Sequence, residues 1–215
     1  MPLIIPANTL SDAAYSVANS CRFNDGDSAY MLKAAGAGNR RTFTFNTWVK
    51  LGQLGTSRYL FTSYSAGNAA GFSYLQITAT ESGVHVGDVI SFEVYGVILL
   101  RTTQVIRDPS AWYMITVAVD TTSGTANNRC RMYLNGTEIT DFATRNNPAE
   151  DADLAYNQDG VDLVLASNDY GGTKGNYFDG YLAETVWIDG TQYAASDFGE
   201  FDEDSPTIWK PKDVS

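Results

Sequence analysis

Hydrophobic and polar residues alternate along most of the chain with the period of two that is typical of β-strands. The clearest run is TFTFNTWVKL (Thr42–Leu51), and the run AWYMITVAVD (Ala111–Asp120) is apolar on both faces, as expected of a central strand covered on both sides. Further runs rich in β-branched and aromatic residues occupy residues 58–64, 71–78, 89–100 and 130–140. The only helical candidate is a short turn at 194–201, so the pattern predicts an all-β protein.

Turn signals separate these runs at short intervals. In LNGTEI, Asn135 and Gly136 supply the positive φ angles of a tight hairpin turn. Many short strands with such punctuation predict a two-sheet antiparallel β-sandwich of jelly-roll type. No repeat or linker indicates a second domain, so we expect one domain, preceded by an extended N-terminal arm at residues 1–19. A single jelly-roll domain, including a C-terminal clasp, then spans residues 20–212.

Composition and charge exclude several classes of function. The chain has 215 residues, of which 44% are hydrophobic, and no apolar run approaches the ~20 residues of a membrane-spanning helix. We therefore expect no membrane insertion. The N-terminus has no basic region, so it reads as an arm punctuated by Pro2 and Pro6 and not as a signal peptide. The net charge of −11 and 14 acidic residues against Lys174 alone between residues 150 and 205 argue against nucleic-acid binding.

The two cysteines are too few for a disulfide framework. Cys130 alternates in phase with Met132 and Leu134, and Cys21 shares its phase with Phe23. Both are therefore expected to be small buried hydrophobic residues in a protein that folds in a reducing cytosol.

Six blocks occur in order along the chain: SCRFNDGDSAYM, NRRTFTFNTWVKLGQLG, RDPSAWYMITVAVDTT, RMYLNGTEI, YFDGYLAETVWIDG and FGEFDEDSPTIWKPK. Over residues 20–212 they resemble the concanavalin A-like (laminin-G-like) jelly-roll domains of bacteriophage structural proteins, particularly in phages of marine bacteria. The resemblance implies a concanavalin A-like jelly roll in a virion component that is assembled in the host cytoplasm. Its partners would be other virion proteins, capsid or tail, and further copies of itself.

The acidic run near the C-terminus has the spacing of a carboxylate ladder. Glu200, Asp202 and Asp204 lie at i, i+2 and i+4, which places three side chains on one face of a strand, as in retaining glycosidases. In such a strand Glu203 would point into the core, where an unpaired carboxylate costs several kcal/mol. We therefore expect a solvated acidic turn, with cation binding as its only functional alternative.

The residues after this turn are expected to form the clasp. Ile208 and Trp209 would pack back on the sandwich, while Pro206 and Pro211 fix the path of the chain. The only histidine, His85, lies in no recognisable triad, and no metal or nucleotide motif is present. We therefore expect no enzyme.

Oxygen-rich loop residues leave one cofactor open. None is required, but the resemblance implies that Ca²⁺ is the ion to consider, because such jelly rolls bind it through loop oxygens. The candidate ligands are Asp25, Asp27, Asn168 and Asp169, with Asp151, Asp153 and Asp159 as further acidic loop residues.

Two long loops, 144–160 and 167–177, are the candidates for ligand binding. Their tyrosines, Tyr156, Tyr170 and Tyr177, are the candidates for stacking on sugar rings. In the arm, Leu3, Ile4 and Ile5 are the candidates for attachment by adding a strand to a partner's sheet.

Three hypotheses for function remain. The leading one is a non-enzymatic virion protein, a capsid decoration, head fibre or compact appendage subunit. The second is a tail-fibre or receptor-binding module that recognises a host-surface glycan. A glycoside hydrolase is the least favoured.

Overall fold

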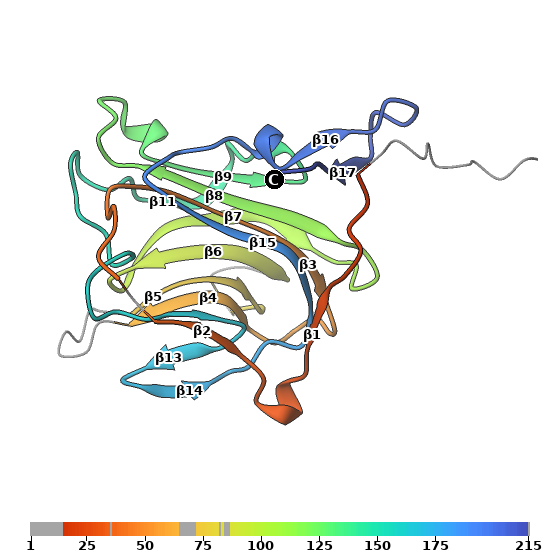
Figure 1. The fold of residues 1–215 in the computed structure, drawn as a ribbon, viewed down its shortest axis with the longest axis horizontal. Coiled ribbons are helices and arrows are strands. Elements are labelled where there is room, and N and C mark those ends of the chain that lie inside the picture. The colour runs from red at the N-terminus through yellow and green to blue at the C-terminus, as the bar shows by residue number, and fades with distance from the viewer. Residues whose placement is uncertain (1–14, 35, 65–71, 82, 84–86, 215) are drawn as a thin grey trace, which may run out of the picture.

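The computed structural model describes residues 15–34, 36–64, 72–81, 83 and 87–214. Two large sheets pack face to face, and every strand pairing in this part of the chain is antiparallel. The predicted two-sheet antiparallel β-sandwich is therefore confirmed (Figure 1). No helix of the described residues is long and apolar enough to cross a membrane. The N-terminal attachment candidates Leu3, Ile4 and Ile5, and also His85, lie outside the described residues.

The first sheet has six strands, which in spatial order are β1 (Cys21–Phe23), β15 (Gly180–Asp189), β3 (Thr42–Leu51), β8 (Tyr113–Asp120), β9 (Cys130–Leu134) and β10 (Thr137–Glu138). The second has seven, in the order β11 (Phe142–Arg145), β7 (Val97–Ile106), β6 (Asp88–Val94), β5 (Phe72–Thr78), β4 (Arg58–Tyr64), β12 (Leu163–Leu165) and β2 (Met31–Lys33).

Two short hairpins lie outside these sheets. They are β13 (Asn168–Tyr170) with β14 (Thr173–Gly175), and β16 (Gly199–Phe201) with β17 (Trp209–Pro211). Figure 1 shows the first at the bottom of the molecule and the second at the top. Short 3₁₀ turns, η1 (Asp25–Asp27), η2 (Ala126–Asn128) and η3 (Ala195–Asp197), complete the structure.

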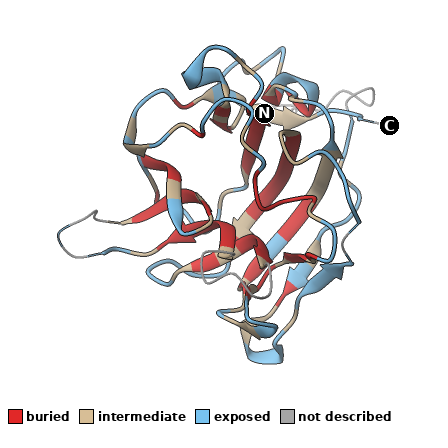
Figure 2. Ribbon diagram, turned by 90° about the vertical axis from the view of Figure 1, so that its left-hand side faces the viewer, coloured by how far each residue is buried: buried red, intermediate tan, exposed pale blue. Residues whose placement is uncertain are grey.

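The main core lies between the two large sheets, where Figure 2 shows the strands mostly buried. Strand β8 supplies Ile115 and Val117 to this core, while Met114 and Ala118 on its other face join a second buried cluster with Phe198. The C-terminal residues thus cover the outer face of the six-stranded sheet, as the doubly apolar pattern of β8 predicted.

The sequence pattern locates β3, β4, β5 and β8 to within two residues, and it misses the turn inside one predicted run. Residues 89–100, expected as one strand, form the β6–β7 hairpin. Tyr95 and Gly96 adopt φ angles of 52° and 75° there, so both central residues have the positive φ of a tight hairpin turn. The Asn135–Gly136 turn, with φ angles of 47° and 78°, is confirmed.

The alternation of side chains along β15 changes phase at a β-bulge. The pairing with β3 shifts register between Ala183 and Val186, and Glu184 between them has a φ of 46°. Leu182 therefore faces the core between the sheets, whereas Val186 packs on the outer cluster. Simple alternation does not continue through these positions, because a bulge inserts one extra residue and exchanges the two faces.

The cysteines are free, as expected. Cys130 is buried in the main core with Met132 and Leu134, and burial raises the pKa of its thiol to about 12. Cys21 is half-buried and packs against the same core.

Candidate functional site

Tyr156, which was expected to be an exposed loop tyrosine, is fully buried. Its ring stacks on Phe61 and Phe92, with centroid distances of 5.0 and 5.8 Å. Loop 144–160 therefore inserts apolar side chains into the sandwich instead of presenting them to solvent. The expectation that Tyr156 stacks on a ligand was wrong, because its ring is packed in the core between the two sheets.

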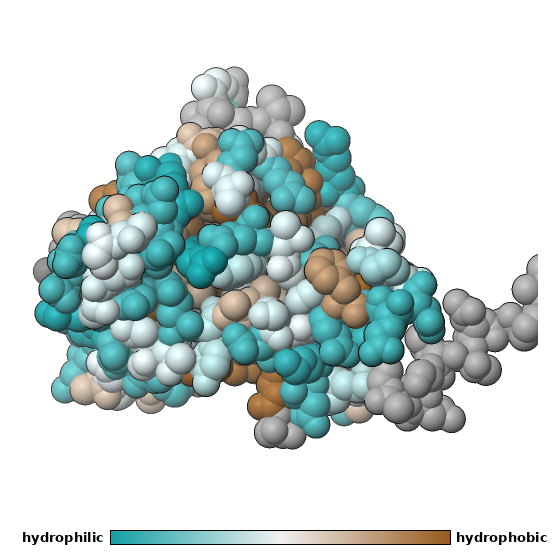
Figure 3. Space-filling model, turned by 90° about the horizontal axis from the view of Figure 1, so that it is seen from above, coloured by the Kyte–Doolittle hydropathy of each residue, from teal (hydrophilic) through white to brown (hydrophobic). Residues whose placement is uncertain are grey.

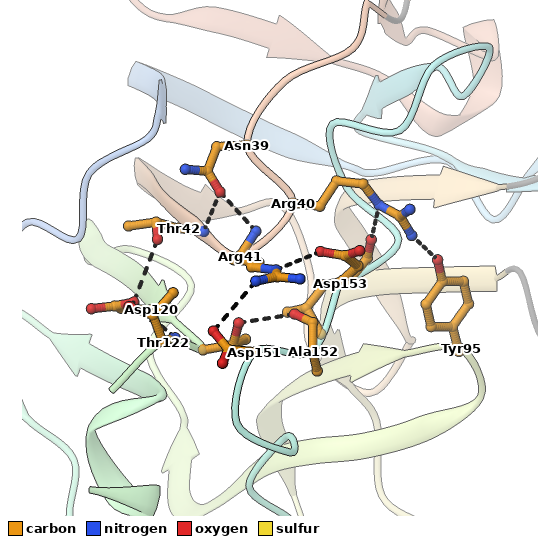
Figure 4. A network of polar contacts seen from close by, with 12 residues as sticks. Asn39, Arg40, Arg41, Thr42, Tyr95, Asp120, Thr122, Asp151, Ala152 and Asp153 are labelled. Atoms are coloured by element: carbon orange, nitrogen blue, oxygen red, sulfur yellow. Dashed lines mark hydrogen bonds and ion pairs between the residues drawn. The ribbon is translucent and has the colours of Figure 1, made fainter. Parts of the chain in front are cut away.

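Ion pairs and backbone contacts hold this loop in place (Figure 4). The Arg41 guanidinium lies 2.8 Å from a carboxylate oxygen of Asp153 and 3.3 Å from one of Asp151. Arg40 Nε donates to the Leu154 carbonyl at 2.8 Å. The hydrogen bond to Arg41 holds the pKa of the Asp153 carboxyl below its usual range. These two acidic residues are therefore neutralised by an arginine.

The calcium candidates at η1 already have protein partners. An oxygen of Asp25 lies 3.3 Å from Nη2 of the buried Arg58. Asp27 accepts a 2.7 Å hydrogen bond from the side-chain amide of Asn24.

The other calcium candidates lie on the β13–β14 hairpin. Asp169 is buried, forms a 2.8 Å ion pair with Lys174 and accepts a hydrogen bond from the Gly172 amide. The neighbouring Asn168 begins β13 and is half-buried. Within the described part of the chain, no three His, Cys, Asp or Glu side chains are grouped to hold a metal ion. The structure thus does not join these residues to Asp25 and Asp27 in one site.

The two remaining tyrosine candidates lie on or beside the same hairpin. Tyr177 is half-buried and packs against Tyr30 at a centroid distance of 6.4 Å. Tyr170 is 60% exposed, and its ring lies against Tyr64 and Phe72, at 5.5 and 5.8 Å. Of the three candidates, Tyr170 alone belongs to a larger aromatic surface.

We call this surface the aromatic face, and it comprises Tyr59, Tyr64, Phe72, Tyr74 and Tyr170. Its rings form a continuous series across β4, β5 and β13. Phe72 lies 5.0 Å from Tyr74 and 5.8 Å from Tyr59, and the Tyr59 and Tyr74 rings meet edge to face at 5.3 Å. The sequence contained a signal for part of this face, because Phe72 and Tyr74 alternate in β5 and must point the same way.

The aromatic face covers the outer side of the seven-stranded sheet. Leu75, which follows Tyr74, packs in the core between the sheets, so the neighbouring ring points to the opposite side. In register, Tyr64 is paired with Phe72. Directly paired residues share one side of a sheet, which explains why rings from different strands meet.

A row of polar side chains continues the outer side of the same sheet. We call it the polar row, and it comprises Gln76, Ser91 and Arg101. Gln76 is paired with Ser91, and Ser91 with Arg101, while Tyr59 of the aromatic face is paired with Gln76. The row therefore runs across β5, β6 and β7, perpendicular to the strands.

The polar row is buried and unsatisfied. Among the described residues, Gln76 Oε1, Ser91 Oγ and Arg101 Nε find no hydrogen-bond partner. Buried polar atoms are almost always paired with protein or ordered water, so three unpaired atoms side by side need an explanation, such as an ordered water, an ion or another bound molecule.

The Glu93 carboxylate affects the ionisation of two hydroxyls of the aromatic face, those of Tyr74 and Tyr59. The Tyr74 hydroxyl donates a 2.5 Å hydrogen bond to Glu93. Burial, this hydrogen bond and the Glu93 charge together raise the pKa of Tyr74 far above its usual range. Burial and the same charge raise the pKa of Tyr59. Both hydroxyls therefore remain protonated donors at neutral pH, beside rings that offer apolar surface.

The acidic run near the C-terminus forms no catalytic strand. Lys210 lies 3.5 Å from Glu200 and 3.6 Å from Asp202, so one lysine serves both carboxylates. Phe201, which a ladder would bury, is 46% exposed. The run begins as a short hairpin strand, where the sequence indicated only a turn, and continues as a turn, and Trp209 packs on the outer cluster. Ile208, expected to pack beside it, is instead 57% exposed.

A separate hollow lies on the six-stranded sheet. It has a volume of about 330 Å³ and is lined mainly by Trp48, Trp112, Trp209 and residues 17–20. The C-terminal hairpin forms one of its walls. Figure 3 shows this end of the molecule as a mostly hydrophilic surface with small hydrophobic groups.

Comparison with known proteins agrees with this architecture. A family model described as "Concanavalin A-like lectin/glucanases superfamily" matches residues 24–195, most of the chain. Comparison of the sequence with curated proteins gives no match.

Three solved structures illustrate the shared fold. One is domain 4 of AbnA, an extracellular arabinanase from Geobacillus stearothermophilus, solved with arabinotriose; the TM-score is 0.53 at 15% identity, over 85% of this chain and 80% of that one. A pentraxin from Limulus polyphemus has a TM-score of 0.53 at 13% identity, over 74% and 68%. Tailspike protein 2 of Escherichia coli O157:H7 bacteriophage CAB120 has a TM-score of 0.55 at 14% identity, over 93% of this chain and 27% of the tailspike. At these identities the similarity concerns the fold.

Proposed function

Because the chain belongs to the concanavalin A-like lectin and glucanase superfamily, we propose that it is a non-catalytic domain that binds carbohydrate at the aromatic face. The observation that carries this proposal is the juxtaposition of five neighbouring aromatic rings with three buried polar side chains, each of which has one atom without a hydrogen-bond partner among the described residues. A sugar ring has an apolar face and a rim of hydroxyls. The aromatic face can pack against the first, and the polar row can form hydrogen bonds with the second.

The geometry supports binding across the strands. Tyr170 and Phe72 offer ring surface at one side, and the unpaired atoms of Gln76 and Ser91 lie further across the sheet. Gln76 Oε1 accepts and Ser91 Oγ both donates and accepts, which suits the vicinal hydroxyls of a saccharide once the side chains that shield these buried atoms from solvent move aside. The arabinanase domain, which shares the fold and was solved with arabinotriose, gives this proposal a precedent in fold only.

No constellation in the described residues supports the hydrolase alternative. A retaining glycosidase needs two carboxyl groups about 5 to 5.5 Å apart across a substrate cleft. Glu200 and Asp202 share Lys210, and Glu93 is hydrogen-bonded to Tyr74 within the aromatic face. We therefore propose binding without bond cleavage.

We further propose that the domain is displayed on a bacteriophage particle, as a capsid decoration, head fibre or compact appendage. The six sequence blocks support this role, and a phage tailspike contains the same fold. In this proposal Leu3, Ile4 and Ile5 attach the domain to other virion proteins or to further copies, and the aromatic face is directed outward. The alternative, a tail-fibre module for host adsorption, uses the same face for a host-surface glycan.

Binding to an array of host-surface and marine polysaccharides tests the carbohydrate proposal. Tyr170→Ala and Phe72→Ala should each weaken binding about tenfold, because a lost ring contact of ~1.4 kcal/mol corresponds to that factor. Tyr181→Ala is the matched control, since Tyr181 is 38% exposed on the other sheet. Failure of the wild-type protein to bind any glycan, or equal loss in all three variants, would contradict the proposal.

Incorporation into particles tests the display proposal separately. Deletion of residues 1–10 should abolish incorporation while leaving glycan binding by the isolated protein unchanged. Normal incorporation of the truncated protein would refute the attachment role of Leu3, Ile4 and Ile5. A low-resolution map of the virion would then locate the domain on the head or the tail.

A further inference from the structure

Arg101, at one end of the polar row, is a buried cation with almost no partner. Its side chain is 8% exposed, and its single ion pair with a described residue is a 3.7 Å contact from Nη1 to Oε2 of Glu81. Among the described residues Nε has no hydrogen-bond partner. A guanidinium carries five N–H donors, and leaving the buried Nε–H without a partner is costly. The other buried arginine, Arg58, has a comparable ion pair, but Arg101 alone lies beside the aromatic face.

The register places Arg101 at a defined distance from the rings. Arg101 is paired with Ser91, Ser91 with Gln76, and Gln76 with Tyr59. Three strand spacings therefore separate β7, which carries Arg101, from β4, which carries Tyr59. At ~4.8 Å per strand this is about 14 Å, the scale of a short oligosaccharide lying across the strands. One ligand can therefore reach the rings and Arg101 together.

We propose that the ligand of this face is an acidic glycan, and that an oxyanion substituent, a carboxylate or a sulfate ester, binds the Arg101 guanidinium. The proposal rests on the carbohydrate-binding function proposed above and specifies its ligand class. The planar fork of an arginine matches such oxyanions, and the charge-assisted hydrogen bonds are stronger than neutral ones.

Glu81 holds the place that the ligand anion takes. Its side chain is 55% exposed, and its 3.7 Å contact is longer than a hydrogen bond, so it can leave to water at little cost. Glu93, the other acid of this face, is hydrogen-bonded to Tyr74. The net charge of −11 does not prevent this contact, because charges further than about 8 Å are largely screened at physiological ionic strength.

Matched pairs of ligands test the inference with the full chain. The carboxylate pair is oligogalacturonate and its methyl ester, and the sulfate pair is κ-carrageenan oligosaccharide and its desulfated form. The wild-type protein should bind the charged member of at least one pair about tenfold more tightly, and the preferred pair identifies the oxyanion. Arg101→Gln should reduce this ratio to about one, and Arg101→Lys should restore part of it.

Glu81→Gln should change the ratio of charged to neutral affinity in the direction opposite to Arg101→Gln. Because Glu81 is exposed, this variant remains informative if the Arg101 variants fail to fold. It should raise the ratio of charged to neutral affinity about threefold, because the competing carboxylate is gone. Equal wild-type affinity for charged and neutral members, or a ratio unaffected by both substitutions, would overturn the acidic-ligand inference. If the wild-type protein binds a neutral glycan and Tyr170→Ala does not, the carbohydrate proposal is still supported. Failure of the acidic-ligand inference can therefore be distinguished from failure of the carbohydrate proposal.

Discussion

Gly136 lies directly against the indole ring of Trp209: a Cβ built on this glycine would fall 2.3 Å from two carbons of the ring. The same glycine has a φ of 78° in the hairpin turn between β9 and β10. The turn therefore needs glycine for two reasons, its backbone conformation and the approach of the C-terminal hairpin. The indole N–H of Trp209 is also 3.2 Å from the sulfur of Met114, on the central strand β8.

Trp209→Ala should lower the free energy of unfolding by about 3 kcal/mol, because the ring covers the outer cluster of the six-stranded sheet. Urea unfolding monitored by circular dichroism measures this change. Ile208→Ala is the matched control in the same hairpin, and its 57% exposed side chain should make its effect less than about 0.5 kcal/mol. Similar small effects of both substitutions would show that the C-terminal hairpin contributes no packing.

Gly136→Ala should destabilise the protein by about 2 to 3 kcal/mol, the sum of left-handed backbone strain and a clash with the Trp209 ring. In a Trp209→Ala background the clash disappears, so the same substitution should cost only about 1 kcal/mol. A double-mutant cycle of unfolding free energies measures the coupling. Strict additivity would mean that the two residues do not contact in solution.

The sequence predicted those parts of the fold that local pattern controls. Period-two alternation located β3 and β4 to the residue, and the asparagine–glycine pair located the β9–β10 turn. The bulge at Glu184 and the turn at Tyr95 were missed, because non-glycine residues adopt positive φ there. Tertiary packing imposes the bulge, which no residue type announces, whereas Gly96 was the single signal for the turn at Tyr95.

The candidate site was predictable only in part. Tyr170 was identified from its loop, but the other rings of the aromatic face lie on separate strands, and only the sheet order brings them together. The polar row depends on three strand registers, which composition cannot reveal. For Tyr156 the sequence predicted a site residue that the structure buries. Most of its long loop is polar, and this composition does not show that the middle of the loop packs in the core.

Tyr156→Ala should lower the free energy of unfolding by about 4 kcal/mol, as expected for loss of a large buried ring. Tyr156→Phe should cost less than about 1 kcal/mol, because the hydroxyl makes one long hydrogen bond of 3.4 Å to the Glu93 carbonyl. Denaturant unfolding of both variants checks the contrast. Loss of glycan binding in Tyr156→Ala at unchanged stability would instead restore a direct role in ligand binding.

Calcium should leave the thermal midpoint unchanged when melts in excess calcium and in chelator are compared. Two of the three candidate carboxylates already have a cationic partner, Arg58 for Asp25 and Lys174 for Asp169. An ion that binds the folded state at one hundred times its Kd would add about 2.7 kcal/mol to the free energy of unfolding. Differential scanning fluorimetry detects such a gain, and a higher midpoint with calcium would contradict this prediction.

Stability should fall as the pH rises above about 10, the pKa of an unfolded tyrosine. The folded state holds the pKa of Tyr74 far above that value through burial and Glu93. Above pH 10 the unfolded chain therefore loses a proton that the folded protein keeps, and the free energy of unfolding decreases with pH. Below that pH both states keep the proton, so the contribution is fully present.

Tyr74→Phe removes the ionisable group and should make the alkaline decrease shallower. At neutral pH the variant should be less stable by about 1 kcal/mol, because Glu93 loses the hydrogen bond from the hydroxyl. Urea unfolding at intervals from pH 8 to about 11 measures both effects, since the change in slope reports the proton that Tyr74 retains. An identical pH dependence in the two proteins would mean that Tyr74 ionises in the folded state as readily as in the unfolded chain. The Tyr74 hydroxyl would then not be a fixed donor within the aromatic face.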